Sequence, residues 1–160
     1  MSVLLAPAKG TGRAGSLTHS SKPVDFAPGL DGQTIVLTSV LSINKNVSVD
    51  GRALSTPVII DGNNAVRILR VTTNVSAPLA GLTLARGRAQ PGGALLVETG
   101  AVVTLTNATV LSSTSTSDGG GIYNYGTMLV LSSTFAGNSS SIDGGSFYNV
   151  GRLTLQGSTL

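Results

Sequence analysis

The 160-residue chain contains no cysteine and no tryptophan, and only 4% of its residues are aromatic and 11% charged. The lack of cysteine excludes a disulfide scaffold and any thiolate metal site. No apolar run approaches the roughly 18 residues of a membrane-spanning helix. The opening MSVLLAPA also lacks the basic region and the long apolar stretch of a secretory signal peptide. We therefore expect no membrane-spanning segment, and any export signal would lie outside this sequence or be of another type.

What is present favours strands and turns. Hydrophobic residues make up 41% of the chain, mostly as Val, Leu, Ile and Ala interleaved with Ser, Thr, Asn and 21 Gly. Such a composition supports one domain with a real core and offers little to helices. The net charge of +3 is modest, and the basic residues are not interleaved with aromatics. Nucleic-acid binding is therefore not expected.

The C-terminal half contains an internal repeat. Residues 120–135 read GGIYNYGTMLVLSSTF and residues 145–160 read GSFYNVGRLTLQGSTL, with Tyr, Asn, Gly, Ser and Thr identities at a spacing of 25. A looser copy, GGALLVETGAVVTLTNATV, occupies residues 92–110. Repeats of this length are typical of solenoids and propellers.

Apolar residues alternate within each copy, which is the pattern of a strand with one buried face. Leu84, Val110, Phe135 and Leu160 follow one another at spacings of 26, 25 and 25, so we expect them to form one inward-facing column. The alternation also predicts burial of four further residues, Met128, Val130, Leu153 and Leu155, and outward positions for Leu129, Leu131 and Thr154.

Together these patterns predict an all-β fold, a right-handed parallel β-helix (solenoid) of about five rungs of roughly 25 residues. Three short strands and three turns fill such a rung, and no ten-residue stretch with helical periodicity occurs. The rungs are expected within residues 32–160. Residues 1–31 are rich in Pro and Gly and show no repeat, so we expect an irregular N-terminal lead-in or cap.

Five of the six aspartates precede glycine, a pair that is typical of turns: Asp31, Asp50, Asp61, Asp118 and Asp143. The spacing of 25 between Asp118 and Asp143 predicts that they stack on neighbouring rungs, and Asp50 and Asp61 could also approach each other. Turn formation is the plain interpretation, with an adventitious Ca²⁺ site or catalytic carboxylates as alternatives. We assign no catalytic residue, no metal ligand and no cofactor.

Two N-terminal features resemble functional motifs. Residues 10–15 spell GxGxxG, but the following segment, SLTHSSKPVDFAPG, is unsuited to the helix that a dinucleotide site requires. His19, the only histidine, has no nearby acid and no GxSxG sequence that would complete a catalytic triad. Neither feature is predicted to carry a function.

The repeat aligns Asn124 with Asn149 and Tyr123 with Tyr148. We interpret the asparagines as a hydrogen-bonded ladder and the tyrosines as stacked rings. Because exposed tyrosine faces also stack on sugars, Tyr123 and Tyr148 are candidate glycan-binding residues.

Four arginines, Arg67, Arg70, Arg86 and Arg88, are expected in adjacent rungs. Scattered solvated charge is the plain interpretation. The alternative is a basic face for an anionic polysaccharide, so the four remain candidate binding residues.

Two short motifs resemble those of bacterial polymorphic outer membrane protein repeats and related right-handed β-helix surface proteins. That family is marked by GGA followed by an aliphatic residue and by FxxN, and here residues 92–95 read GGAL and residues 135–138 read FAGN. Residues 32–51 resemble the lead-in of secreted β-helix proteins. The second and third GG sites depart from the pattern, reading GGGIY and GGSFY. The resemblance implies an extracellular or cell-surface location and a role in adhesion or surface coating.

The function predicted from the sequence is a non-enzymatic structural or adhesive module. The alternatives are a polysaccharide-degrading enzyme of the pectate lyase type, which would need converging carboxylates, and a glycan-binding module. Residues 156–160 end in mid-repeat without a helix, proline or charge cluster that would cover a strand edge. We therefore expect end-to-end rung stacking with another copy, giving a homo-oligomer or filament.

Overall fold

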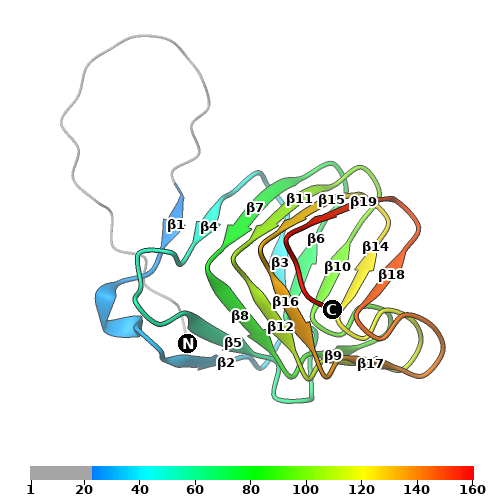
Figure 1. Ribbon diagram of the computed structural model, residues 1–160, viewed down its shortest axis with the longest axis horizontal. Helices are drawn as coiled ribbons and strands as arrows, with labels where there is room; N and C mark the ends of the chain where they lie inside the picture. The colour runs from blue at the N-terminus through cyan, green and yellow to red at the C-terminus, as the bar shows by residue number, and fades with distance from the viewer. Residues whose placement is uncertain (1–22) are drawn as a thin grey trace, which may run out of the picture.

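The computed structural model describes residues 23–160, which form a parallel β-solenoid of about five rungs (Figure 1). Each rung contributes one strand to each of three long sheets, and from the third rung on also to a short fourth sheet. This confirms the predicted all-β parallel β-helix. In the part of the chain described, no helix is long and apolar enough to cross a membrane.

The strands are grouped by sheet as follows. Sheet A contains β1 (Val24–Asp25), β4 (Val49–Asp50), β7 (Ser76–Ala80), β11 (Val102–Thr106), β15 (Thr127–Leu131) and β19 (Arg152–Gln156). Sheet B contains β2 (Thr34–Val36), β5 (Val58–Asp61), β8 (Leu82–Ala85), β12 (Thr109–Leu111) and β16 (Thr134–Ala136). Sheet C contains β3 (Leu41–Ile43), β6 (Leu69–Val71), β10 (Leu95–Val97), β14 (Ile122–Asn124) and β18 (Phe147–Asn149). Sheet D contains β9 (Arg88–Ala89), β13 (Thr114–Ser115) and β17 (Ser139–Ser140).

The chain visits the sheets in the order A, B, D, C, so rung 1 runs from β1 to β3 and rung 5 from β15 to β18. A partial rung 6 follows, made of β19 and of Thr159, which bridges to Thr134. Within the segment expected to be an irregular lead-in, β1 already pairs with β4 in sheet A, and the short 3-10 helix η1 (Pro28–Leu30) follows it. The GxGxxG segment and His19 lie outside the described residues.

The core is a set of inward columns that run along the stack. Leu84, Val110 and Phe135 are in register in sheet B and are at most 2% exposed, and Met128 and Val130 are equally buried. Leu129 and Leu131 are half-buried and Thr154 is exposed, in keeping with outward positions.

Burial fails at the end of the stack. Leu153 is only half-buried, Leu155 is 40% exposed and Leu160 is 64% exposed, although all three were predicted to be buried. Their register is as expected, because Leu155 pairs with Val130 and Leu160 follows Thr159. They are exposed because, within the described chain, no further rung stacks on them.

The corner between sheets A and B contains one residue with left-handed backbone geometry in each of the later rungs. Gly81, Asn107, Ser132 and Gly157 occupy this corner in successive rungs, with φ between 46° and 63°. Glycine and asparagine adopt this conformation readily, whereas serine does so at some cost. This backbone conformation explains why the corner position is occupied by glycine, asparagine or serine in successive rungs.

At the GG sites the backbones of neighbouring rungs approach each other closely. A Cβ atom on Gly93 would collide with the carbonyl oxygen of Gly120, and one on Gly120 would collide with that of Ser139. Side chains are therefore excluded here by the packing of backbone on backbone.

Candidate functional site

The asparagine ladder links rungs 4 and 5. Asn124 is fully buried, and its Nδ2 donates hydrogen bonds to Oδ1 of Asn149 at 2.7 Å and to the carbonyl oxygen of Arg152 at 3.0 Å. Its own Oδ1 accepts the Gly126 N–H at 3.0 Å. Every polar atom of this buried amide is used, so Asn124 is a structural residue.

A serine ladder, which the sequence analysis did not assign, runs along the corner between sheets A and B. The Ala108 N–H donates to Oγ of Ser133 at 3.1 Å, and the Ser133 N–H donates to Oγ of Ser158 at 3.2 Å. The Ser133 hydroxyl in turn donates to the Leu131 carbonyl at 2.8 Å. The identity of Ser133 and Ser158 at a spacing of 25 was the available signal. In both ladders a side chain from one rung completes the hydrogen bonding of the rung before it.

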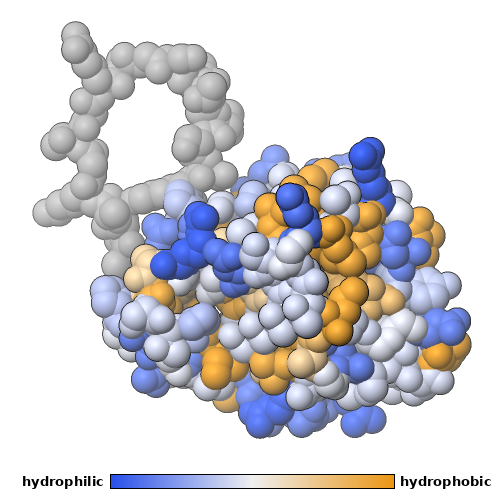
Figure 2. All heavy atoms as spheres, viewed as in Figure 1, coloured by the Kyte–Doolittle hydropathy of each residue, from blue (hydrophilic) through white to orange (hydrophobic). Residues whose placement is uncertain are grey.

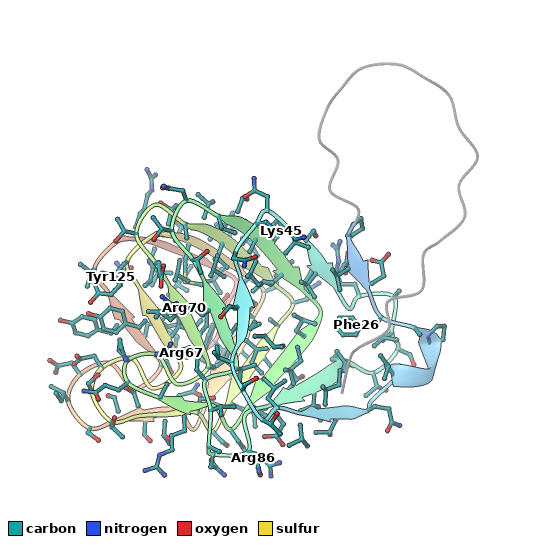
Figure 3. All side chains as sticks on the ribbon, turned by 180° about the vertical axis from the view of Figure 1, so that it is seen from behind. Phe26, Lys45, Arg67, Arg70, Arg86 and Tyr125 are labelled. Carbon is teal, nitrogen blue, oxygen red and sulfur yellow. The ribbon has the colours of Figure 1, made fainter. Side chains whose placement is uncertain are left out.

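The three tyrosines form one cluster on the outer side of sheet C. The rings of Tyr123 and Tyr148 stack with centroids 4.9 Å apart, and Tyr125 tilts against Tyr123 at 4.6 Å. Tyr123 is only 7% exposed, and this burial raises the pKa of its phenol, which therefore stays neutral at physiological pH. Tyr125, not singled out from the sequence, is 43% exposed and projects from the surface (Figure 3).

The Arg67 side chain donates hydrogen bonds to backbone carbonyl groups. Its Nε donates to the Gly92 carbonyl at 3.0 Å, and its second nitrogen donates to the carbonyls of Pro91 and Gln90. Burial lowers the pKa of this half-buried guanidinium. Arg67 thus holds the loop that precedes the first GG site.

Arg70 and Arg86 are each bound to a carboxylate. Arg70 Nε donates to Glu98 at 2.6 Å, and Glu98 also accepts the N–H and hydroxyl of Thr73. Arg86 forms an ion pair with Asp61, whose side chain is 1% exposed. The hydrogen bonds from Arg86 hold the pKa of the Asp61 carboxyl below its ordinary value.

The four candidate arginines therefore do not form one basic face. Arg67 and Arg70 lie together, whereas Arg86 lies at a distant part of the surface (Figure 3). Arg88 is exposed and has no carboxylate partner among the residues described. This placement departs from the alternative of one basic face, because sequence spacing does not show which arginines are bound in ion pairs.

Four of the aspartates that precede glycine use their carboxylates in hydrogen bonds or ion pairs within the chain. Oδ1 of Asp118 accepts the Asp143 N–H at 3.2 Å, so these two residues stack as expected. Asp31 accepts the Thr56 N–H and the Ser55 hydroxyl, both at 2.7 Å. Asp50 pairs with Arg52, and Asp61 with Arg86, rather than with each other. Within residues 23–160, no three potential metal ligands gather.

One shallow groove of about 260 Å³ lies over sheet D. It is lined by Arg88 and by six residues with hydroxyl side chains: Thr114, Ser115, Thr116, Ser139, Ser140 and Ser141. Arg88 is in register with Thr114, so it lies at one end of the hydroxyl rows. The groove offers hydrogen-bond donors but no carboxylate.

Comparisons with protein-family models, with curated proteins and with solved structures found no match.

Proposed function

We propose that this chain is a non-enzymatic structural or adhesive solenoid module of a secreted or cell-surface protein, and that copies stack end to end. The observation that supports this proposal most strongly is the position of the exposed apolar side chains. Seven of the nine exposed large hydrophobic side chains among the described residues lie at the two ends of the stack: Val36, Val40 and Leu41 in rung 1, and Ile142, Val150, Leu155 and Leu160 at the other end. Figure 2 shows apolar side chains on the face where the last strands lie.

The inward columns of sheets A and B would continue across such a contact. One column runs from Val24 through Leu105 to Leu155, and a second from Ile35 through Val110 to Leu160. Stacking rung 1 of a second copy on rung 6 would place Val24 on Leu155 and Ile35 on Leu160. The contact is head-to-tail, so it would not close on itself and would build a filament.

The pairing of three of the carboxylates favours a structural role over an enzymatic one. Asp61, Asp50 and Glu98 are each neutralised by an arginine. A polysaccharide lyase or hydrolase needs carboxylates that are free to bind Ca²⁺ or to transfer a proton.

A pair of lysine substitutions tests the stacking. Thr154→Lys with Leu160→Lys places charge on the terminal edge, and the mass measured by light scattering should fall to that of the monomer. The matched control, Thr104→Lys with Thr127→Lys, adds the same charge on the outer side of sheet A and should assemble like the parent chain. Equal assembly of both variants would exclude the proposed contact.

A second function, glycan binding, is favoured by the tyrosine cluster. Tyr125 and Tyr148 each pack against Tyr123 and leave part of their aromatic surface exposed, and sugars bind to such surfaces by stacking. Binding to a panel of neutral and acidic polysaccharides should be lost on Tyr125→Ala and retained on Val102→Ala, which also removes an exposed apolar side chain.

A further inference from the structure

We infer that the groove over sheet D binds an acidic polysaccharide, with Arg88 pairing to a uronate carboxylate and the hydroxyl rows bonding to the hydroxyls of the sugar chain. The inference goes beyond the proposed function, because it requires neither end-to-end stacking nor the tyrosine cluster of sheet C. The central strand of the groove, β13, lies between β9 and β17. The groove therefore runs over the interior of the stack.

Arg88 supplies a cation that the fold itself does not use. Its side chain is exposed and forms no hydrogen bond or ion pair within residues 23–160. The other three candidate arginines donate to backbone carbonyls or to carboxylates of the chain. Asp118 and Asp143 begin the turns that follow β13 and β17, and they do not line the groove. Arg88 can therefore pair with a carboxylate from a ligand, through two parallel hydrogen bonds.

Most of the hydroxyl groups in the groove are also unused. Four of the six, those of Thr114, Thr116, Ser139 and Ser140, make no hydrogen bond within the described chain, whereas the other two do. The backbone beneath them is already satisfied, because the N–H groups of Thr114 and Ser139 donate to carbonyls of the preceding rung at 2.8 and 2.9 Å. A ligand could thus bond to these side chains without competing with the fold.

The order of these groups suits an acidic sugar better than a simple anion. Thr114 is in register with Arg88 on one side and with Ser139 on the other, so a cation and two hydroxyls follow one another at the rung spacing of about 4.8 Å. A serine or threonine hydroxyl both donates and accepts hydrogen bonds, as the hydroxyl of a sugar does, whereas an inorganic anion only accepts. The row therefore matches a carboxylate followed by further hydroxyls.

The size of the groove indicates a polymer that lies across the surface. Its volume of about 260 Å³ is smaller than that of the clefts that enclose small molecules, about 300 to 1,000 Å³. A shallow site gains little from one enclosed sugar. It can bind one segment of a longer chain whose remaining units stay in solvent.

The direct test is the binding of a fluorescently labelled short oligogalacturonate, followed by anisotropy. We expect saturable binding, weakened by about tenfold or more when the same oligomer is methyl-esterified, because esterification removes the charge and keeps the ring hydroxyls. Inorganic sulfate at an equal concentration should not displace the oligomer. No binding, equal binding of the ester, or displacement by sulfate would each overturn the inference.

Chain variants locate the site. Arg88→Gln should weaken binding of the acidic oligomer by about tenfold and leave binding of the ester unchanged. Thr116→Val keeps the side-chain shape and removes one hydroxyl, so binding should weaken by about threefold. Thr134→Val is the matched control, because Thr134 is exposed on sheet B outside the groove.

Two further measurements separate this site from the proposed functions. Tyr125→Ala should retain binding of the acidic oligomer, and the lysine pair that blocks stacking should retain it as well. Loss of binding in Tyr125→Ala together with full binding in Arg88→Gln and Thr116→Val would place the ligand on the tyrosine cluster and contradict the inference. Thermal unfolding confirms that each variant is folded, and the comparison of acid with ester in the parent chain does not depend on any variant.

Discussion

The first three rungs and the rungs that follow fill the inward column of sheet C with different kinds of residue. In the innermost column of sheet C, rungs 1 to 3 carry Ile43, Val71 and Val97, whereas rungs 4 and 5 carry Asn124 and Asn149. The aliphatic residues are held by packing alone. Asn124 is instead held by directed hydrogen bonds to Asn149 and Arg152, which follow it in the stack. One backbone path is therefore compatible with interchangeable apolar residues or with polar ladders of fixed identity.

The largest expected effect tests the aliphatic part. Leu105 is fully buried, so Leu105→Ala should lower the free energy of unfolding by about 4 kcal/mol through lost burial and a cavity. Leu105→Met, which conserves volume, should cost less than about 1.5 kcal/mol. Urea unfolding measures both. Similar losses for the two variants would show that this column is as residue-specific as the ladders.

The next effect concerns the ion pair of the early rungs between the exposed Arg86 and the buried carboxylate of Asp61. Arg86→Ala would leave the buried Asp61 carboxylate without its charged partner and should lower the free energy of unfolding. Arg88→Ala, two residues away on the exposed surface, should change stability by less than about 0.5 kcal/mol. Thermal unfolding of the two variants compares them, and a stable Arg86→Ala chain would refute a structural role for the pair.

A smaller loss of stability is expected at a position where the fold requires a particular residue type and not only a particular side-chain volume. Asn124→Leu keeps a similar side-chain size but leaves the Gly126 N–H without an acceptor, and should cost about 2 kcal/mol. Asn149→Leu, at the exposed edge, should cost clearly less in the monomer, because water can reach the groups that it leaves. Equal costs at the two positions would remove the distinction between interior and edge.

The smallest effect is a dependence on pH that should be confined to the early rungs. Arginine partners hold the pKa values of Asp61 and Asp50 below their ordinary values, so both carboxylates stabilise the fold at neutral pH. This contribution is fully present above about pH 4 and is lost as the pH falls through the lowered folded-state pKa values. The neutral ladders do not titrate.

Hydrogen exchange at decreasing pH would report this difference. After correction for intrinsic exchange rates, the amides of rungs 1 to 3 should lose protection below pH 4 before those of rungs 4 and 5. An Asp61→Asn chain should show a shallower loss of stability with acid. Uniform loss of protection along the stack would contradict the assignment.

The same contrast explains what could be predicted from the sequence. The repeat is exact where ladders require Asn124, Asn149, Ser133 and Ser158, and this region gave the spacing, the strand faces and the fold. The sequences of the earlier rungs are less similar to one another because aliphatic residues replace one another freely. Their register could therefore be recognised only from the alternation of strands and turns.

The candidate site was less predictable, because it depends on which groups are already paired. Arg70 and Arg86 are bound by carboxylates 28 and 25 residues away, and no short motif announces such pairs. The exposure of Leu155 and Leu160 follows from their place at the end of the stack, which alternation alone cannot show.

Particle mass as a function of concentration, with electron microscopy of the same samples, tests the central claim most directly. The account predicts particles that lengthen along one axis as concentration rises and that stay short when Thr154→Lys and Leu160→Lys are introduced. A chain that remains monomeric at high concentration, or that assembles equally with and without those lysines, would contradict it.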